Sequence, residues 1–177
     1  MNENGKHNIF ICGFMATGKS TVGKLLAAKM HCKFFDMDAL IEAEAGMAIS
    51  QIFASLGEQA FRVMESRMVK RFEKRSGCVV ATGGGVIVNP GNLQILKRCG
   101  VVITLTASVE SILLRAGKDD TRPLLQVEDK AERIRTLMKQ REPYYSQADI
   151  ILDTSALSID AVVSALADRL KEFGFSV

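Results

Sequence analysis

The sequence predicts an α/β protein, a three-layer α/β/α sandwich around a five-stranded parallel sheet. Short apolar runs rich in β-branched residues alternate with longer segments of helical periodicity, which is the pattern of βαβ units. The runs are apolar almost throughout, as expected for strands that helices cover on both faces. A length of 177 residues is typical of one domain, so we expect a single domain over residues 1–177.

The expected elements follow one another in a regular order. Strands are expected where Val, Ile and Phe dominate, at residues 8–14, 33–38, 78–84, 101–106 and 149–154. Helices are expected where apolar residues recur at helical spacing, at residues 19–30, 39–46, 49–77, 91–100, 108–117, 128–141 and 158–174. The segment AGKDDTRPLL, residues 116–125, is polar and contains glycine and proline, so it predicts a surface loop.

The composition excludes several classes of protein. Hydrophobic residues make up 47% and charged residues 24%, which is typical of a globular chain. A net charge of +3 is too small for a protein that coats nucleic acid or a membrane surface. The sequence has no signal-peptide core or membrane-spanning run, so we expect a cytoplasmic protein. The 4 cysteines form no CxxC pair, which disfavours zinc and redox sites.

The first predicted strand leads into a phosphate-binding motif. Residues Gly13 to Ser20 read GFMATGKS and fit the pattern G-x-x-x-x-G-K-[ST] between a strand and a helix. Backbone N–H groups in such a turn form a concave anion site, to which the helix N-terminus adds partial positive charge. Lys19 is expected to reach the β- and γ-phosphates, and Ser20 to bind Mg²⁺. The alternative is an ordinary turn with a surface lysine. No N-K-x-D guanine signature occurs, which favours ATP.

Three further segments point to the acceptor of the phosphoryl group. Asp36 and Asp38 are expected at a strand end, one near the water shell of the metal and one facing the attacking hydroxyl, although Asp38 also suits a helix cap. Arg62 and Glu65 lie three apart on a predicted helix, where the carboxylate can hold the guanidinium, as in any surface ion pair. The glycines of 82–85 suggest close approach to a ligand, or a plain tight turn.

Together these motifs resemble the shikimate kinase family. The resemblance rests on GFMATGKS, the DMD pair, GEQAFRVMES, ATGGG, the RPLL of 122–125 and Arg141 ahead of PYY, in the order and at the spacing of that family. It covers nearly the whole chain. It implies a P-loop, nucleoside-monophosphate-kinase-like fold with sheet order 2-3-1-4-5. It also implies transfer of the γ-phosphoryl group of ATP to the 3-hydroxyl of shikimate, which gives shikimate 3-phosphate and ADP on the route to chorismate and the aromatic amino acids.

The resemblance also implies roles for individual residues. The catalytic set would be Lys19, Asp38 and Arg122. ATP would be bound by Gly13, Ala16, Thr17, Gly18, Lys19, Ser20, Thr21, Arg115 and Arg122. Shikimate would be bound, mainly within a region at about 36–65, by Asp38, Arg62, Gly83, Gly84, Gly85 and Arg141. Magnesium would be held by Ser20 and Asp36. A lid at about 115–126 would bring Arg122 onto the ATP phosphates, and Arg115 would stack on adenine.

These implied roles suit the chemistry of the acceptor. Shikimate carries a carboxylate and three vicinal hydroxyls, so a fitting site needs guanidinium forks at one end and an accepting carboxylate at the other. Arg62, Arg141 and Asp38 supply that set. Closing the lid would exclude water, which otherwise competes with the acceptor for the phosphoryl group.

Two alternatives remain at this point. Another small-molecule kinase of the same fold, such as a gluconate kinase, would leave Arg62 and Arg141 without their carboxylate if its acceptor were neutral or differently shaped. A non-catalytic nucleotide-binding module would have no physical reason to keep the complete set, which is Lys19, Ser20, Asp36, Asp38 and Arg122. We therefore expect a monomeric enzyme whose partners are ATP and shikimate, with no nucleic acid and no membrane.

One residue departs from the pattern of the family. Ala16 stands where the family often has glycine, and we expect a negative φ there, because a methyl group is poorly tolerated at positive φ. The loop that begins at Asp153 is expected near adenine, with the side chain that packs on the base left open.

Overall fold

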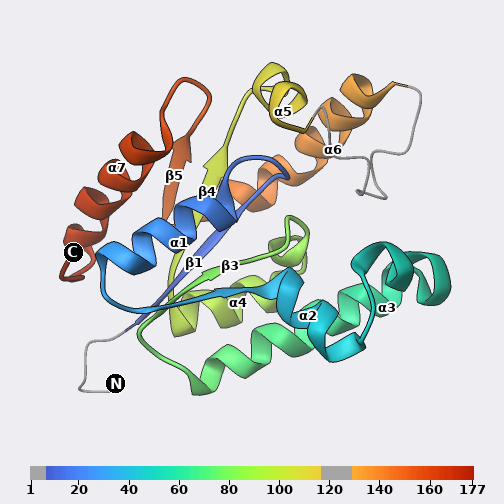
Figure 1. Cartoon of the computed structure of the whole chain (residues 1–177), viewed down its shortest axis with the longest axis horizontal. Helices are drawn as coiled ribbons and strands as arrows, with labels where there is room; N and C mark the ends of the chain where they lie inside the picture. Colours follow the sequence, from blue (N-terminus) through green and yellow to red (C-terminus); the bar gives the residue numbers. More distant parts are fainter. Residues whose placement is uncertain (1–6, 117–128) are drawn as a thin grey trace.

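The computed structural model describes residues 7–116 and 129–177 (Figure 1). The strands are β1 (Asn8–Gly13), β2 (Lys33–Asp36), β3 (Cys78–Ala81), β4 (Gly100–Thr106) and β5 (Ile150–Asp153). The helices are α1 (Lys19–Lys29), α2 (Met37–Ala45), α3 (Ile49–Arg71), α4 (Pro90–Cys99), α5 (Val109–Ala116), α6 (Lys130–Tyr145) and α7 (Ile159–Glu172). Two short 3-10 segments are η1 (Phe72–Lys74) and η2 (Val86–Val88). Most of the predicted lid, including Arg122, lies outside these described residues.

The strands form one parallel sheet in the order β2-β3-β1-β4-β5, which confirms the order that the family resemblance implied. Helices α1 and α7 pack side by side on one face, and α2 to α6 lie on the other side (Figure 1). The order places β1 in the centre, so its carboxyl end opens between β3 and β4. In open α/β sheets this is where ligands bind.

Burial of both sheet faces explains the apolar strands. All six residues of β1 are buried, and successive side chains point to opposite faces. Ile9 and Ile11 pack with the α1 and α7 side, whereas Phe10 and Cys12 pack with the other. The predicted three-layer arrangement follows from this two-sided core.

Several predicted boundaries were wrong. Strand β3 ends at Ala81 and not at residue 84, and helix α3 ends at Arg71 and not at residue 77. Strand β2 ends at Asp36, so Asp38 lies in the first turn of α2, because the Asp36 side chain accepts from the N–H groups of Asp38 and Ala39 and caps that helix. Helix α3 is broken at Gly57, whose φ of 83° and ψ of 166° are not helical. Helix α6 continues past Pro143 to Tyr145, whose buried ring and hydrogen-bonded hydroxyl anchor the last turn.

Within residues 7–116 and 129–177, no single helix is long and apolar enough to cross a membrane. Helix α2 and the segment Ile49–Lys74 reach that length and composition only as a pair, across a bend of 88°.

Candidate functional site

The phosphate loop joins β1 to α1. A Cβ atom on Gly13, which has φ of 136°, would run into the carbonyl oxygen of Leu105 on β4, so only glycine fits there. Inside the loop, the Thr17 hydroxyl and the Lys19 ammonium each donate to the carbonyl oxygen of Phe14 at 2.8 Å. No side chain caps α1 and its first turn has no acidic residue, so the amide dipoles at its N-terminus are available to an anion.

Ala16 adopts φ of 59°, so the expected negative φ was wrong. The chain has to reverse direction within a few residues between β1 and α1, and a left-handed residue makes that turn. The methyl group remains, at a cost of roughly 1–2 kcal/mol for a non-glycine residue in this region. Its side chain packs against the core on the α2 to α6 side of the sheet.

A pair of oxygen ligands lies directly beside the phosphate loop. The Ser20 hydroxyl donates to Asp36 Oδ2 at 2.6 Å, while Asp36 Oδ1 caps α2. Hydroxyl and carboxylate oxygens are the ligands that Mg²⁺ prefers. No cluster of three or more His, Cys, Asp or Glu side chains suited to a metal occurs in the described parts of the chain. This pair therefore fits an ion whose remaining ligands are phosphate oxygens and water.

A cavity of about 560 Å³ continues from the phosphate loop toward α5 and α7. Arg115 lines it, and its guanidinium donates to the carbonyl oxygen of Thr154 at 2.7 Å and to the Thr154 hydroxyl at 3.1 Å. The other wall includes Leu157 and Ile159, which the sequence analysis left unassigned. These two apolar side chains are 38% and 45% exposed, and together they give the cavity an apolar surface suited to a flat base.

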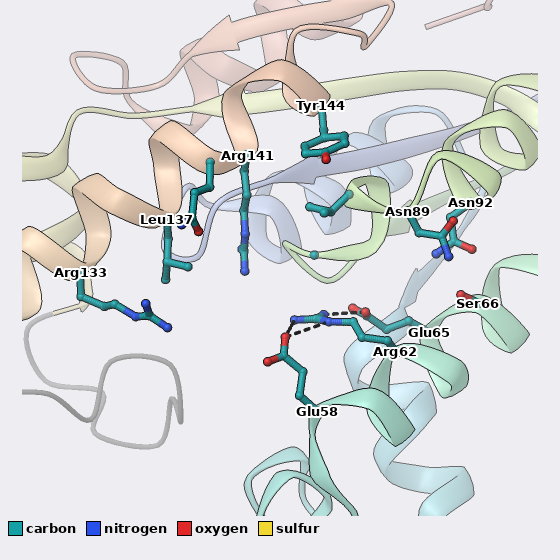
Figure 2. A pocket seen from close by; sticks show the side chains of 13 residues that line it. Glu58, Arg62, Glu65, Ser66, Asn89, Asn92, Arg133, Leu137, Arg141 and Tyr144 are labelled. Atoms are coloured by element: carbon teal, nitrogen blue, oxygen red, sulfur yellow. Dashed lines mark hydrogen bonds and ion pairs between the residues drawn. The ribbon is translucent and has the colours of Figure 1, made fainter.

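A second cavity, of about 750 Å³, lies between α3, α6 and the segment after β3 (Figure 2). Three predicted residues line it: Arg62 from α3, Arg141 from α6, and Gly85. The wall also contains residues that sequence reasoning missed: Glu58, Ser66, Val88, Asn89, Asn92, Arg133, Leu137, Gln140 and Tyr144. These residues carry no local signal in the sequence, because the elements that bear them meet at the cavity only through the tertiary fold.

The three glycines after β3 lie against side chains of the site. A Cβ on Gly85 would overlap the Arg62 guanidinium, and one on Gly83 would lie 2.6 Å from Glu65 Oε1 and 2.9 Å from Asp38 Oδ1. A Cβ on Gly84 would lie 3.1 Å from the carbonyl oxygen of Gly13 and 3.2 Å from Arg141 Nη1.

The row of glycines therefore lies between the phosphate loop, which Gly84 approaches at Gly13, and the second cavity, which Gly85 lines. Predicted residues Asp38, Gly83 and Gly84 do not line that cavity and lie at its boundary with the loop.

Arg62 is held by carboxylates on two sides. Its Nη1 donates to Glu65 Oε2 at 2.6 Å, which confirms the predicted pair, and its Nη2 and Nε donate to Glu58 Oε1 at 2.7 Å and 3.2 Å. Burial raises the pKa of Glu65 to about 6, although the Arg62 charge opposes this and Asp38 adds to it. Burial would lower the pKa of Arg62, but Glu65 and Glu58 outweigh it, so the pKa is raised and the guanidinium stays charged.

Arg141 is 8% exposed, and its guanidinium carbon lies 5.4 Å from the ring centre of Phe14 in the phosphate loop. One turn later, the Tyr145 hydroxyl donates to the carbonyl oxygen of Gly84 at 2.7 Å. Burial raises the pKa of Tyr145 to about 12, so the hydroxyl keeps its proton and remains a donor. These contacts fix α6 against both the phosphate loop and the glycine row.

Known protein families and curated proteins include close matches to this sequence. The family model described as shikimate kinase matches residues 15–171. A shikimate kinase of Geobacter sulfurreducens is 45% identical over 165 residues, which cover 93% of this chain and 91% of that protein. A shikimate kinase of Thermoanaerobacter pseudethanolicus is 47% identical over 155 residues, covering 88% of this chain and 91% of its own.

Solved structures give the same result. The structure of shikimate kinase from Acinetobacter baumannii in complex with shikimate has a TM-score of 0.92 and 34% identity, and covers 97% of both chains. Thymidylate kinase from Candida albicans has a TM-score of 0.62 at 14% identity, which shows the fold alone.

Proposed function

This chain belongs to the shikimate kinase family and is an ATP-dependent kinase, and from that premise we propose that it converts shikimate and ATP to shikimate 3-phosphate and ADP with the two cavities described above. The cavity beside the phosphate loop takes the nucleotide, and the cavity between α3 and α6 takes shikimate. The solved relative from Acinetobacter baumannii, which is in complex with shikimate, supports this choice of acceptor.

In this proposal Arg62 and Arg141 bind the shikimate carboxylate. Their guanidinium groups enter the same cavity from α3 and α6 (Figure 2), and each offers a planar fork that matches a carboxylate. Shikimate bound there would lie with its ring hydroxyls toward Gly83 and Asp38, on the side of the phosphate loop. Asp38 then accepts a hydrogen bond from the 3-hydroxyl and directs it toward the γ-phosphate.

The phosphoryl group is stabilised by the loop. Lys19 turns from the Phe14 carbonyl oxygen to the β- and γ-phosphates, while the loop amides and the α1 N-terminus hold the phosphate oxygens. Ser20 and Asp36 would hold Mg²⁺, directly or through water. When bound, such an ion neutralises charge on the phosphates. Arg115 is expected against adenine, and Arg122 remains a predicted lid residue outside the described part of the chain.

The observation that supports this function most strongly is the convergence of Arg62 and Arg141 on one cavity, beside a row of glycines that also approaches the phosphate loop at Gly13. A coupled ADP-release assay with ATP and magnesium tests it. We expect shikimate to stimulate ADP release, and gluconate and nucleoside monophosphates to leave it near the background rate. Stimulation by gluconate or a nucleotide in place of shikimate would reject the proposal.

A further inference from the structure

Two carboxylates already share the Arg62 guanidinium before any acceptor arrives (Figure 2). Glu65 accepts a hydrogen bond from Nη1, and a single oxygen of Glu58 accepts from both Nε and Nη2, which form one edge of the guanidinium. That edge is one of the two at which a guanidinium binds a carboxylate with two parallel hydrogen bonds. An incoming carboxylate therefore meets an arginine whose charge is already shared.

The two partners of Arg62 differ in how firmly they are held. The Glu65 side chain is 2% exposed and cannot leave without moving the core. The Glu58 side chain is 56% exposed and follows directly after Gly57, where the helix is broken. Exposed ion pairs contribute little stability, because water and salt screen them. Glu58 can therefore leave Arg62 when another carboxylate binds there, whereas Glu65 cannot.

We propose that Glu58 is an internal competitor that occupies Arg62 in the empty site and is displaced by the carboxylate of the acceptor. This inference rests on the proposed function, in which Arg62 binds that carboxylate. Glu58 then acts as a specificity-determining residue. An acceptor that fills the cavity gains enough contacts to displace it, whereas a small carboxylate that only contacts Arg62 does not.

The cavity also offers a place for Glu58 after displacement. Arg133, Leu137 and Arg141 follow one another at a spacing of four on α6, so they lie along one face of that helix. Figure 2 shows the Arg133 side chain reaching into the cavity on the side where Glu58 lies. The Arg133 guanidinium makes no hydrogen bond or ion pair with any of the described residues, so Glu58 can move from one arginine to the other and keep a partner.

The central experiment measures the dissociation constant of shikimate by calorimetry for the unaltered protein and for Glu58→Gln. We expect the constant to fall roughly two- to five-fold in the variant, because the competing ion pair is of the exposed kind. Acetate, which cannot fill the cavity, should compete with shikimate more strongly in the variant. We expect its own dissociation constant to fall by at least the same factor. An unchanged or larger shikimate dissociation constant would overturn the proposal, since a residue that merely supports the site cannot raise affinity when removed.

Glu44→Gln is the matched control. Glu44 forms an exposed ion pair of the same kind with Arg71 at 2.6 Å, away from the cavity. We expect this control to leave shikimate binding unchanged. An equal gain in affinity in Glu44→Gln would count against the proposal, because it would show a general effect of net charge.

Arg62→Gln separates failure of this inference from failure of the proposed function. If Arg62→Gln weakens shikimate binding and Glu58→Gln does not strengthen it, Arg62 binds the acceptor and the competitor idea is wrong. If Arg62→Gln also has no effect, the proposed acceptor site itself is wrong, and the competitor idea fails with it.

A double-mutant cycle tests the role of Arg133. Arg133→Gln alone is expected to raise the shikimate dissociation constant roughly two-fold, because displaced Glu58 then has no partner. In the Glu58→Gln background the same change is expected to have no effect. Equal losses in both backgrounds would mean that Arg133 binds shikimate directly, which would overturn this part of the proposal.

Discussion

The phosphate loop and the acceptor cavity are built in opposite ways. The loop is one uninterrupted stretch from Gly13 to Ser20, and in the proposed function it binds mainly through backbone amides. The acceptor cavity takes its side chains from α3, α6 and the segment after β3, and its charged groups hold one another in place. Backbone geometry depends on a few local residues, whereas a side-chain site depends on every element that carries a part of it. The two regions should therefore respond differently to substitution.

The largest expected effect falls on the acceptor cavity and leaves the phosphate loop unaffected. Asp38→Asn removes the charge that, in the proposed function, faces the acceptor, but it leaves the phosphate loop intact. We expect kcat to fall about 10²- to 10⁴-fold, the usual contribution of a positioned acid or base. The ATP dissociation constant, measured by calorimetry, should stay nearly unchanged. A comparable loss in ATP affinity would show that Asp38 serves the nucleotide instead.

A smaller effect is expected from Arg62→Lys, which keeps the charge and removes the planar fork. Lysine cannot bind a carboxylate bidentately or hold Glu65 and the acceptor together. We expect the shikimate dissociation constant to rise at least about ten-fold, since hydrogen bonds to charged groups contribute about 1.5–3 kcal/mol. The ATP dissociation constant serves as the internal control. Unaltered shikimate affinity would remove Arg62 from the acceptor site.

A pH-dependent effect on stability is expected from Glu65. Its pKa of about 6 in the folded protein lies above the usual 4.5, so the folded state binds a proton more tightly than the unfolded chain does. This contribution to stability is complete below pH 4.5 and is lost as the pH rises through about 6. The total is about 2 kcal/mol, and Glu65→Gln should remove it.

Urea unfolding at several pH values from 4.5 to 7 measures this effect. As the pH rises, the unaltered protein should lose stability relative to Glu65→Gln, so the free energy of unfolding of the variant should rise relative to that of the unaltered protein. A difference between the two proteins that stays constant with pH would mean that Glu65 has an ordinary pKa.

The smallest expected effect lies in the phosphate loop. Ala16→Gly relieves the positive φ but gives the unfolded chain more freedom, and the two terms are both about 1 kcal/mol. We expect the free energy of unfolding to change by less than about 1 kcal/mol. The control Ala28→Gly, at an exposed position within helix α1, should lose about 1 kcal/mol. Equal losses in the two variants would contradict the strain at Ala16.

Local interactions explain which sequence predictions succeeded. The motif from Gly13 to Ser20 was found because its function depends on residues adjacent in the chain. The Arg62 and Glu65 pair was found because both lie on one turn of one helix. The strand end at Asp36 and the φ of Ala16 were mispredicted, because a side-chain cap and a required reversal of the chain outweighed the general preferences of these residues.

The sequence by itself determined the alternation of strands and helices, the phosphate loop and the family. Each depends on spacing along the chain, and periodicity and backbone turns are local properties. Only the tertiary structure decided that Arg133 of α6 shares a cavity with Arg62 of α3, and that Gly84 lies against both Gly13 and Arg141. These contacts join segments far apart in the chain, and they arise because burial of both faces of the sheet brings α3, α6 and the phosphate loop to one edge.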